Sequence, residues 1–360
     1  MKKPTSKPIE LHFPRVNGPI DDKIDELIEE VGVHRAQIVR EMIIAALKAG
    51  QESDDPADLK LMNTTLKEMR FTGKIFSPYR SIRKVTVFGS ARITPDRPVY
   101  LSAKRLGRAL AEKGYMVITG GGPGVMQAVN EGAGPEASFG VNIRLPFEQR
   151  PNPVIDGGPR TINYKYFFNR KVAFLKETDA VVLFPGGFGT MDEAMETMTL
   201  VQTGKNAPLP ILLFEEPGAS YWKRWRQFLR KELEIPGYIG PNDLDLLDVV
   251  ESVGEAVETI DRFYSGFHSL RYVREKLVLR FLKPACKQCI RTLGEEFSDI
   301  LVPGGALQQT GPLPEEADEP DLASLSRLVV DFDRRNFARL RRLIDSVNKC
   351  LQKETGKESP

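Results

Sequence analysis

This chain is poor in the side chains that most often organise metal and disulfide sites. Its 360 residues include three cysteines and three histidines. So few cysteines do not suggest a disulfide framework, and Cys286 and Cys289 together supply only half a zinc site. We expect these two to be small core or partly exposed side chains. His12, His34 and His268 lie in no recognisable motif, which argues against a histidine-centred mechanism.

Long apolar runs and a strong net charge are lacking as well. No stretch approaches the roughly 20 apolar residues that a membrane helix needs. The formal net charge is +2, so the chain as a whole does not call for a polyanionic partner. Its 41% hydrophobic and 28% charged content are those of a globular protein. We therefore expect a cytoplasmic protein with no membrane partner.

The middle of the chain alternates between strand and helix patterns. Apolar runs typical of buried strands occupy residues 85–88, 116–119, 138–143, 180–184 and 211–214. Helical periodicity lies between and after them, at residues 99–113, 125–131, 164–177, 193–200, 221–233 and 252–264. This alternation predicts an α/β fold, a Rossmann-like doubly wound parallel sheet.

Two further segments flank the main domain, which we place at residues 59–266. Residues 1–58 form a small helical segment and linker, with a candidate strand at 9–13 before two helices. That order is similar to a ribbon-helix-helix module, which would read DNA as a dimer; the alternative is a helical hairpin used for packing or assembly. Residues 267–360 predict a small α/β appendage in βαββα order.

A glycine turn follows the strand at 180–184, in the sequence PGGFGTMDE at residues 185–193. Glycines let the backbone approach an anion, and the free N–H groups of a first helical turn point at it. Thr190 can cap that helix and donate a hydroxyl to a phosphate oxygen. Glu193, one turn further on, would place a carboxylate beside the bound group. The competing interpretation is a tight connection without a ligand.

Two other glycine turns end strands of the same expected sheet, FGSAR at residues 88–92 and GGGPG at 120–124. The carboxyl ends of parallel strands meet at one edge, where ligands bind in this architecture. The turn at 120–124 lacks the G-x-G-x-x-G order, and no clear ribose-binding acid follows it, so a dinucleotide is not indicated. Arg170 and Lys171 could bring a cation to this edge, or could form a solvated helix face.

These motifs occur in an order that resembles the Lonely Guy (LOG) family of nucleoside 5′-monophosphate phosphoribohydrolases, also labelled lysine decarboxylases. The resemblance covers about residues 84–263, half of the chain. It implies cleavage of the N-glycosidic bond of a nucleotide such as AMP, or of a cytokinin riboside 5′-monophosphate, to free base and ribose 5-phosphate. It also implies no metal or organic cofactor, and a homodimer or larger homo-oligomer with the site near the subunit interface.

The resemblance carries roles onto individual residues. Arg170 and Glu193 would be the catalytic pair, with Glu196 near the ribose. A carboxylate beside the anomeric carbon stabilises an oxocarbenium-like sugar and can activate water, whereas Arg170 could serve the leaving base or the phosphate. The expected substrate-binding residues are Gly89, Ser90, Gly121, Gly122, Gly124, Met126, Lys171, Pro185, Gly186, Gly187, Gly189, Thr190 and Glu196.

One position departs from the family pattern. Cytokinin-activating members tend to carry a histidine two residues before the Arg-Lys pair, and this chain has Phe168. That departure favours plain AMP as the substrate. Other hypotheses stay open: a non-catalytic nucleotide sensor or cofactor carrier of the same fold, and a DNA-binding regulator built on the N-terminal segment. A pyridoxal-phosphate decarboxylase is less attractive, since no lysine stands in a distinctive context.

Overall fold

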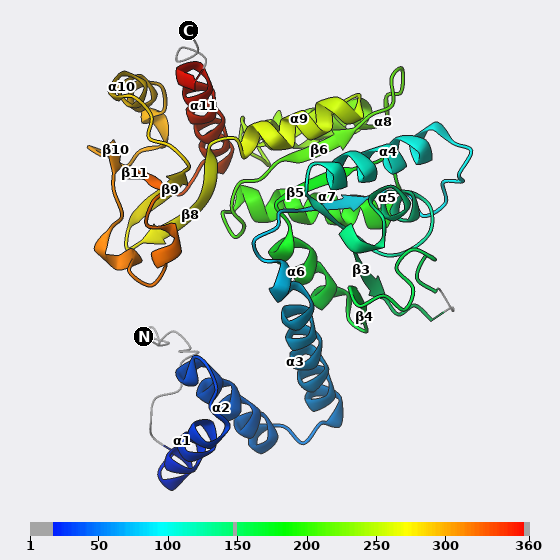
Figure 1. Ribbon diagram of the computed structural model, residues 1–360, viewed down its shortest axis with the longest axis vertical. Coiled ribbons are helices and arrows are strands. Elements are labelled where there is room, and N and C mark those ends of the chain that lie inside the picture. The colour runs from blue at the N-terminus through cyan, green and yellow to red at the C-terminus, as the bar shows by residue number, and fades with distance from the viewer. Residues whose placement is uncertain (1–16, 147–149, 356–360) are drawn as a thin grey trace, which may run out of the picture. The chain divides into compact units, whose positions relative to one another are not determined.

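The computed structural model describes residues 17–146 and 150–355. The chain folds into two compact units, and the boundary between them lies after Glu68. The first unit contains helices α1 (Pro19–Val31) and α2 (Ala36–Glu52) and the beginning of α3 (Pro56–Phe76) (Figure 1). The candidate strand at residues 9–13, on which the ribbon-helix-helix interpretation depends, lies outside the described residues.

Helices α1 and α2 pack against each other around a small apolar core of Ile24, Ile28 and Ile44. Gly32 ends α1: it adopts a φ of 68°, and its N–H donates to the carbonyls of Ile28 and Glu29 at 3.1 Å. Gly50 lies within α2, which continues to Glu52. A single glycine weakens an exposed helix by about 1 kcal/mol, which is too little to terminate it.

The second unit is built on a parallel sheet of β1 (Lys84–Phe88), β2 (Met116–Thr119), β3 (Ser138–Ile143), β4 (Thr161–Tyr164), β5 (Ala180–Leu183), β6 (Ile211–Phe214) and β7 (Leu247–Val250). The strand order is β4-β3-β2-β1-β5-β6-β7, and all neighbours run parallel. The chain winds outward from β1 in one direction and from β5 in the other. This confirms the doubly wound α/β prediction and places the switch point between β1 and β5.

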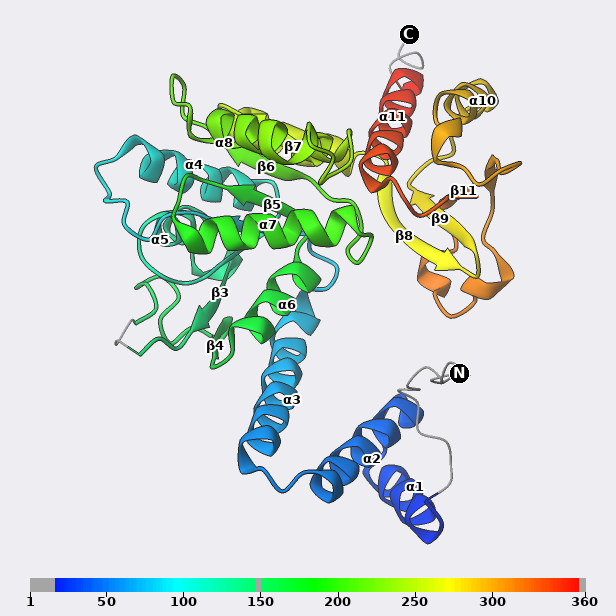
Figure 2. The same cartoon turned by 180° about the vertical axis from the view of Figure 1, so that it is seen from behind.

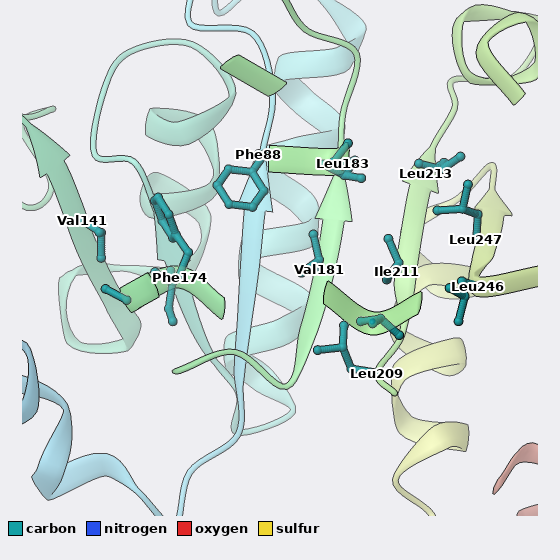
Figure 3. Packing of buried hydrophobic residues seen from close by; sticks show 14 of the residues in the cluster. Phe88, Val141, Phe174, Val181, Leu183, Leu209, Ile211, Leu213, Leu246 and Leu247 are labelled. Carbon is teal, nitrogen blue, oxygen red and sulfur yellow. The ribbon is translucent and has the colours of Figure 1, made fainter. Parts of the chain in front are cut away.

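Strand side chains alternate between two apolar cores, one on each face of the sheet. Val85, Val87 and Val182 enter the core formed with α4 (Pro98–Glu112), α5 (Val125–Ala133) and α9 (Val253–Phe263). Val181 and Leu183 enter the opposite core, drawn in Figure 3, which includes side chains of α6 (Phe167–Glu177), α7 (Phe188–Gln202) and α8 (Tyr221–Leu229). Burial on both faces explains why the strands are continuous apolar runs.

Several boundaries differ from those expected. Strands β4 and β7 were not predicted, and Tyr164 ends β4, whereas α6 begins only at Phe167. Helix α7 begins at Phe188 rather than at Glu193, so Gly189 and Thr190 belong to its first turn. Its N-cap is Gly187, with no side-chain hydrogen bond. Thr190 therefore does not cap this helix, although its hydroxyl stays at the turn.

The C-terminal part contains β8 (Phe267–Val273), β9 (Lys276–Phe281), α10 (Lys287–Glu296), β10 (Leu307–Thr310), β11 (Ser326–Val330) and α11 (Phe337–Thr355). Its sheet has the antiparallel order β10-β11-β9-β8 (Figure 2). The first of these strands adds to the βαββα order expected from the sequence. It pairs with β9 along its length, and Leu277, Leu279 and Phe281 of β9 enter a core that includes side chains of α10 and α11.

A disulfide joins this part of the chain internally. Cys289 of α10 is bonded to Cys350 of α11, 61 residues later, and Cys286 is a free, exposed thiol. Cys289 is a small core side chain, as expected, but the small number of cysteines had not suggested the disulfide that it forms. The bond arises because α10 and α11 cover the same sheet, a tertiary proximity that sequence spacing does not reveal.

Candidate active site

A cavity of about 750 Å³ lies where the loops after the central strands meet. The turns after β1 and β5 are neighbours at the switch point, and the turn after β2 and the start of α8 complete the walls. Its lining residues are Phe88, Gly89, Ser90, Ala91, Arg92, Gly120, Met126, Arg170, Phe174, Gly186, Gly187, Phe188, Gly189, Thr190, Met191, Glu193 and Tyr221. A cavity at the carboxyl edge of a doubly wound sheet is the expected ligand position.

The glycines after β5 serve two different purposes. A Cβ on Gly186 would lie 2.1 Å from Thr190 Oγ1 and 3.0 Å from the backbone nitrogen of Ser90, so only glycine fits there. A Cβ on Gly187 or Gly189 would meet no atom within 4 Å. The first glycine closes the turn, and the other two leave the cavity open to the first backbone N–H groups of α7, those before Thr190, whose own N–H donates to the Gly187 carbonyl at 3.1 Å.

Glu193 lies one turn into α7 with its carboxylate in the cavity wall. The residue is only 3% exposed, and its Oε1 makes no hydrogen bond to any described residue. Lys171 Nζ lies 3.4 Å from Oε2, and Arg170 Nη2 lies 3.8 Å from Oε1. A buried acceptor without a hydrogen bond is costly to maintain, so this oxygen is a prime position for contact with a substrate or a water molecule.

Burial sets the protonation behaviour of the pair. It raises the pKa of Glu193 above the ordinary value of 4.5, and Lys171 and Arg170 only partly oppose the shift. Burial also lowers the pKa of Arg170, which the charge of Glu193 partly restores. A carboxyl group with a raised pKa is suited to exchanging protons with a reactant near neutral pH.

Arg170 and Lys171 occupy different surroundings although they are adjacent on α6. The Arg170 guanidinium lies between the rings of Phe167 and Phe174, 4.9 and 5.6 Å from their centroids, and borders the cavity. Lys171 is not among the lining residues. Its ammonium group bridges the carboxylates of α7, 2.8 Å from Asp192 and 2.7 Å from Glu196. Lys171 therefore pairs with carboxylates of α7 without lining the cavity itself.

The cavity brings together most of the residues expected at the site. Those that line it are Gly89, Ser90, Met126, Arg170, Gly186, Gly187, Gly189, Thr190 and Glu193. The expected residues outside the lining are Gly121, Gly122, Gly124, Lys171, Pro185 and Glu196. Two of these glycines are required by packing, because a Cβ on Gly121 would lie 2.0 Å from Asn142 Oδ1 and one on Gly124 would lie 2.4 Å from the carbonyl of Ser90.

Sequence reasoning missed several wall residues. Tyr221 begins α8, and its hydroxyl donates to the Gly186 carbonyl at 2.5 Å. Phe188 lies at the cavity with 96% of its surface exposed. No local pattern marks Tyr221: it starts the helix that follows β6, and only the strand order of the folded sheet shows that β6 lies beside β5. Nothing in the sequence distinguishes Phe188 from an ordinary helical residue.

Two kinds of feature are absent from the part of the chain that the structure describes. No group of histidine, cysteine and acidic side chains there is placed to hold a metal ion. None of the helices in residues 17–146 and 150–355 combines the length and the apolar composition needed to cross a membrane.

Known proteins resemble this chain over its sheet domain. Residues 119–260 match a family model described as "Possible lysine decarboxylase". Two solved structures share the region: that of TM1055, a structural genomics target (26% identity, 50% of this chain and 99% of the other, TM-score 0.37), and the molybdenum cofactor carrier protein of Chlamydomonas reinhardtii (19%, 50% and 97%, TM-score 0.35).

Three curated relatives are similar to part of this chain. A probable cytokinin riboside 5′-monophosphate phosphoribohydrolase of rice, LOGL5, is 31% identical over 33% of this chain and 49% of its own length. The Arabidopsis thaliana phosphoribohydrolase LOG3 is 26% identical over 50% and 83%. The pyrimidine/purine nucleotide 5′-monophosphate nucleosidase of Escherichia coli K12 is 27% identical over 45% and 39%. The chain thus spans about half the length of the first of them. The sheet domain of this protein is thus similar to the family model and to curated phosphoribohydrolases and nucleosidases, each over half of this chain or less.

Proposed function

We propose that this protein hydrolyses the N-glycosidic bond of a nucleoside 5′-monophosphate, releasing the free base and ribose 5-phosphate. The observation that carries the proposal is the Glu193 carboxylate, which is buried in a cavity wall, has one oxygen without a hydrogen bond to any described residue, and stands one turn beyond an open glycine turn. A phosphate bound at the glycine turn would place the anomeric carbon of the same ribose 5-phosphate group near the Glu193 carboxylate, one helical turn further along.

The reaction follows from the charges that develop as the bond breaks. Cleavage between the anomeric carbon and the base leaves an oxocarbenium-like sugar, and a nearby anionic Glu193 stabilises it. The same carboxylate accepts a proton from the attacking water, whose oxygen becomes the hydroxyl at the anomeric carbon. The protonated Glu193 carboxyl then gives this proton up, through solvent, to the departing base nitrogen, so that one water molecule is consumed, the carboxylate is regenerated and atoms and charge balance. No metal or organic cofactor is needed for these steps.

Arg170 is proposed to act on the other charges of the substrate. Its guanidinium borders both the Gly120 turn and Glu193, since a Cβ on Gly120 would lie 4.0 Å from Arg170 Nη1. From there it can donate to the leaving base or to the phosphate. If it acts on developing charge, Arg170→Ala costs on the order of 2–4 kcal/mol in activation free energy.

AMP is the proposed substrate within this class. Phe168 replaces the histidine typical of cytokinin-activating members, although the rice and Arabidopsis relatives carry cytokinin names. The decisive measurement is a screen of the common nucleoside monophosphates, with cytokinin riboside 5′-monophosphates included, scored for released base by chromatography. We expect AMP to be cleaved fastest.

The matched variant is Glu193→Gln, which keeps the shape of the side chain and removes its charge. We expect it to bind AMP and to release adenine more than about 100-fold more slowly than the wild type. Near wild-type turnover would remove Glu193 from the mechanism. Binding of AMP without base release by the wild type would favour the sensor or carrier alternative instead.

We also propose that a second copy of the chain covers the surface beside the cavity. Helices α6 and α7 expose a group of large apolar side chains there: Phe167, Phe168, Val172, Phe188 and Met195. Such clusters on a protein surface mark interaction sites. Sedimentation of the whole chain tests this, and Val172→Glu should lower the oligomeric state if the surface is the interface.

A further inference from the structure

Glu215 is a buried carboxylate that the proposed reaction does not use. It directly follows β6, is 0% exposed, and its backbone N–H is held by the carbonyl of Val250 in β7 at 2.9 Å. Its side chain accepts the first three N–H groups of α8, from Tyr221 at 2.7 Å and from Trp222 and Lys223 at 3.0 Å. The sheet thereby fixes the first turn of α8, because this side chain supplies acceptors for N–H groups that have none within the helix.

Tyr221 connects the anchored start of α8 to the glycine turn after β5. Its ring packs edge-on against buried Trp222 at a centroid distance of 4.9 Å, and its hydroxyl donates to the Gly186 carbonyl at 2.5 Å. The side chain thus spans from the sheet edge after β6 to the turn after β5. Both of its ends are fixed, one by Glu215 and one by Gly186.

The contact determines which way one peptide group faces. The carbonyl of Gly186 and the N–H of Gly187 belong to the same trans peptide, so they point in opposite directions. Glycines on both sides allow such a peptide to rotate at little steric cost. Rotation would turn a carbonyl oxygen towards the anion position in place of an N–H group. The tyrosine hydroxyl opposes this rotation because the hydrogen bond would be lost.

No hydrogen bond within the described residues uses the N–H of Gly187, which leaves it free for an anion. The geometry points to Glu215 and Tyr221 as a pair of positioning residues that hold the Gly186–Gly187 peptide ready for the phosphate of the substrate. This inference rests on the proposed function only for the identity of the phosphate ester.

The test is the affinity of the whole chain for ribose 5-phosphate, measured by calorimetry, which requires no turnover. Tyr221→Phe keeps the ring and removes the hydroxyl, and we expect it to weaken binding about tenfold. Tyr238→Phe is the matched control, because Tyr238 is 78% exposed and does not line the cavity. Unchanged affinity in a Tyr221→Phe protein that melts like the wild type would overturn the inference.

Glu215→Gln tests whether the carboxylate acts through the tyrosine. We expect it to weaken ribose 5-phosphate binding severalfold, and to have no further effect in the Tyr221→Phe background. If Glu215→Gln weakened ribose 5-phosphate binding by the same factor with and without Tyr221→Phe, the two residues would act independently and the coupling would be refuted. In turnover of AMP, both substitutions should raise KM with little change in kcat. The reason is that the hydrogen bonds to the phosphate stabilise the bound substrate and the transition state equally.

The result also separates this inference from the proposed reaction. Absence of base release from every nucleotide, together with Tyr221-dependent binding of ribose 5-phosphate, would refute the hydrolase and leave the positioning pair intact. Base release by the wild type, together with ribose 5-phosphate binding that Tyr221→Phe leaves unchanged, would support the hydrolase and refute the positioning pair.

Discussion

The Glu193 carboxyl group is buried with one oxygen that no described residue hydrogen-bonds, and this arrangement should reduce the stability of the folded protein. Burial raises its pKa in the folded state above 4.5, so the charged form is disfavoured there. Below pH 4.5 the group is protonated in both states and costs nothing. As the pH rises through the folded-state pKa, the cost appears and persists at neutral pH.

Replacing Glu193 with glutamine should therefore stabilise the protein. We expect Glu193→Gln to melt about 2 °C higher than the wild type at pH 8, roughly 1 kcal/mol, and to lose that advantage below pH 4.5. Calorimetric scans at the two pH values measure the difference. A lower melting temperature at pH 8 would show that the ion pairs with Lys171 and Arg170 outweigh the cost of burial.

The same pKa governs the pH dependence of the proposed activity. Glu193 must be ionised to stabilise a cationic sugar, so kcat/KM for AMP should fall on the acidic side with an apparent pKa above 4.5. Lys171 lowers that pKa, and Lys171→Met should move the acidic limb to higher pH. A limb that does not move in Lys171→Met would indicate that another group controls it.

At the scale of single residues, the sequence was informative wherever a motif is local. Arg170 and Glu193 stand in short, contiguous patterns, and both line the cavity. Tyr221 reaches the glycine turn from 35 residues away, and Glu215 is a buried residue that belongs to none of the motifs. Their roles depend on β6 lying beside β5, which is a property of the folded sheet rather than of any local pattern.

At the scale of elements, the turn after β5 separates glycines needed for folding from glycines needed for binding. Gly186→Ala would place a methyl group on Thr190 and should lower the melting temperature or prevent folding. Gly189→Ala adds the same methyl group where nothing lies within 4 Å, so it should fold normally and bind AMP at least about tenfold more weakly.

Thermal melts and AMP binding, measured on both variants, check this contrast. Equal loss of stability in the two variants would mean that the turn does not distinguish its glycines. Full AMP affinity in Gly189→Ala would place the phosphate elsewhere in the cavity.

The strands that escaped prediction have physical reasons for doing so. Strand β4 has the sequence TINY, only four residues with little apolar content, and it follows an irregular loop. Strand β8 has the sequence FHSLRYV, whose central side chains are only half-buried. The strands that were predicted are buried on both faces, so their apolar runs were visible. Partner strands define β4 and β8 more than their own composition does.

At the scale of the whole molecule, the disulfide between Cys289 and Cys350 closes a long loop of the C-terminal part. Cys350→Ser should lower the free energy of unfolding by about 2–4 kcal/mol. Cys286→Ser is the control: its sulfur accepts the N–H of Cys289 at 3.3 Å, a contact that a serine hydroxyl can replace. Thiol labelling of the unreduced, unfolded wild type should find one reactive thiol, and three would contradict the bond.

This bond also bears on the expected location of the protein. Disulfides persist in oxidising compartments and are rare in the cytosol. In the cytoplasm, Cys289 and Cys350 would therefore be reduced thiols, and the free energy of unfolding would be lower. Thiol labelling in intact cells would show whether the two cysteines are reduced there.

Helix α11, the last of the described elements, serves two structures at once. Leu340 and Leu343 fill the core of the small C-terminal sheet, whereas Ala338 packs into the core of the main sheet. Arg341 donates to the Leu209 carbonyl at 3.1 Å and pairs with Asp248 at 2.9 Å. Shortening the chain to the boundary suggested at residue 266 would therefore remove Ala338 from the core of the main sheet and the Arg341 contacts to Leu209 and Asp248, so the sheet domain needs the last helix of the C-terminal part to complete its own packing.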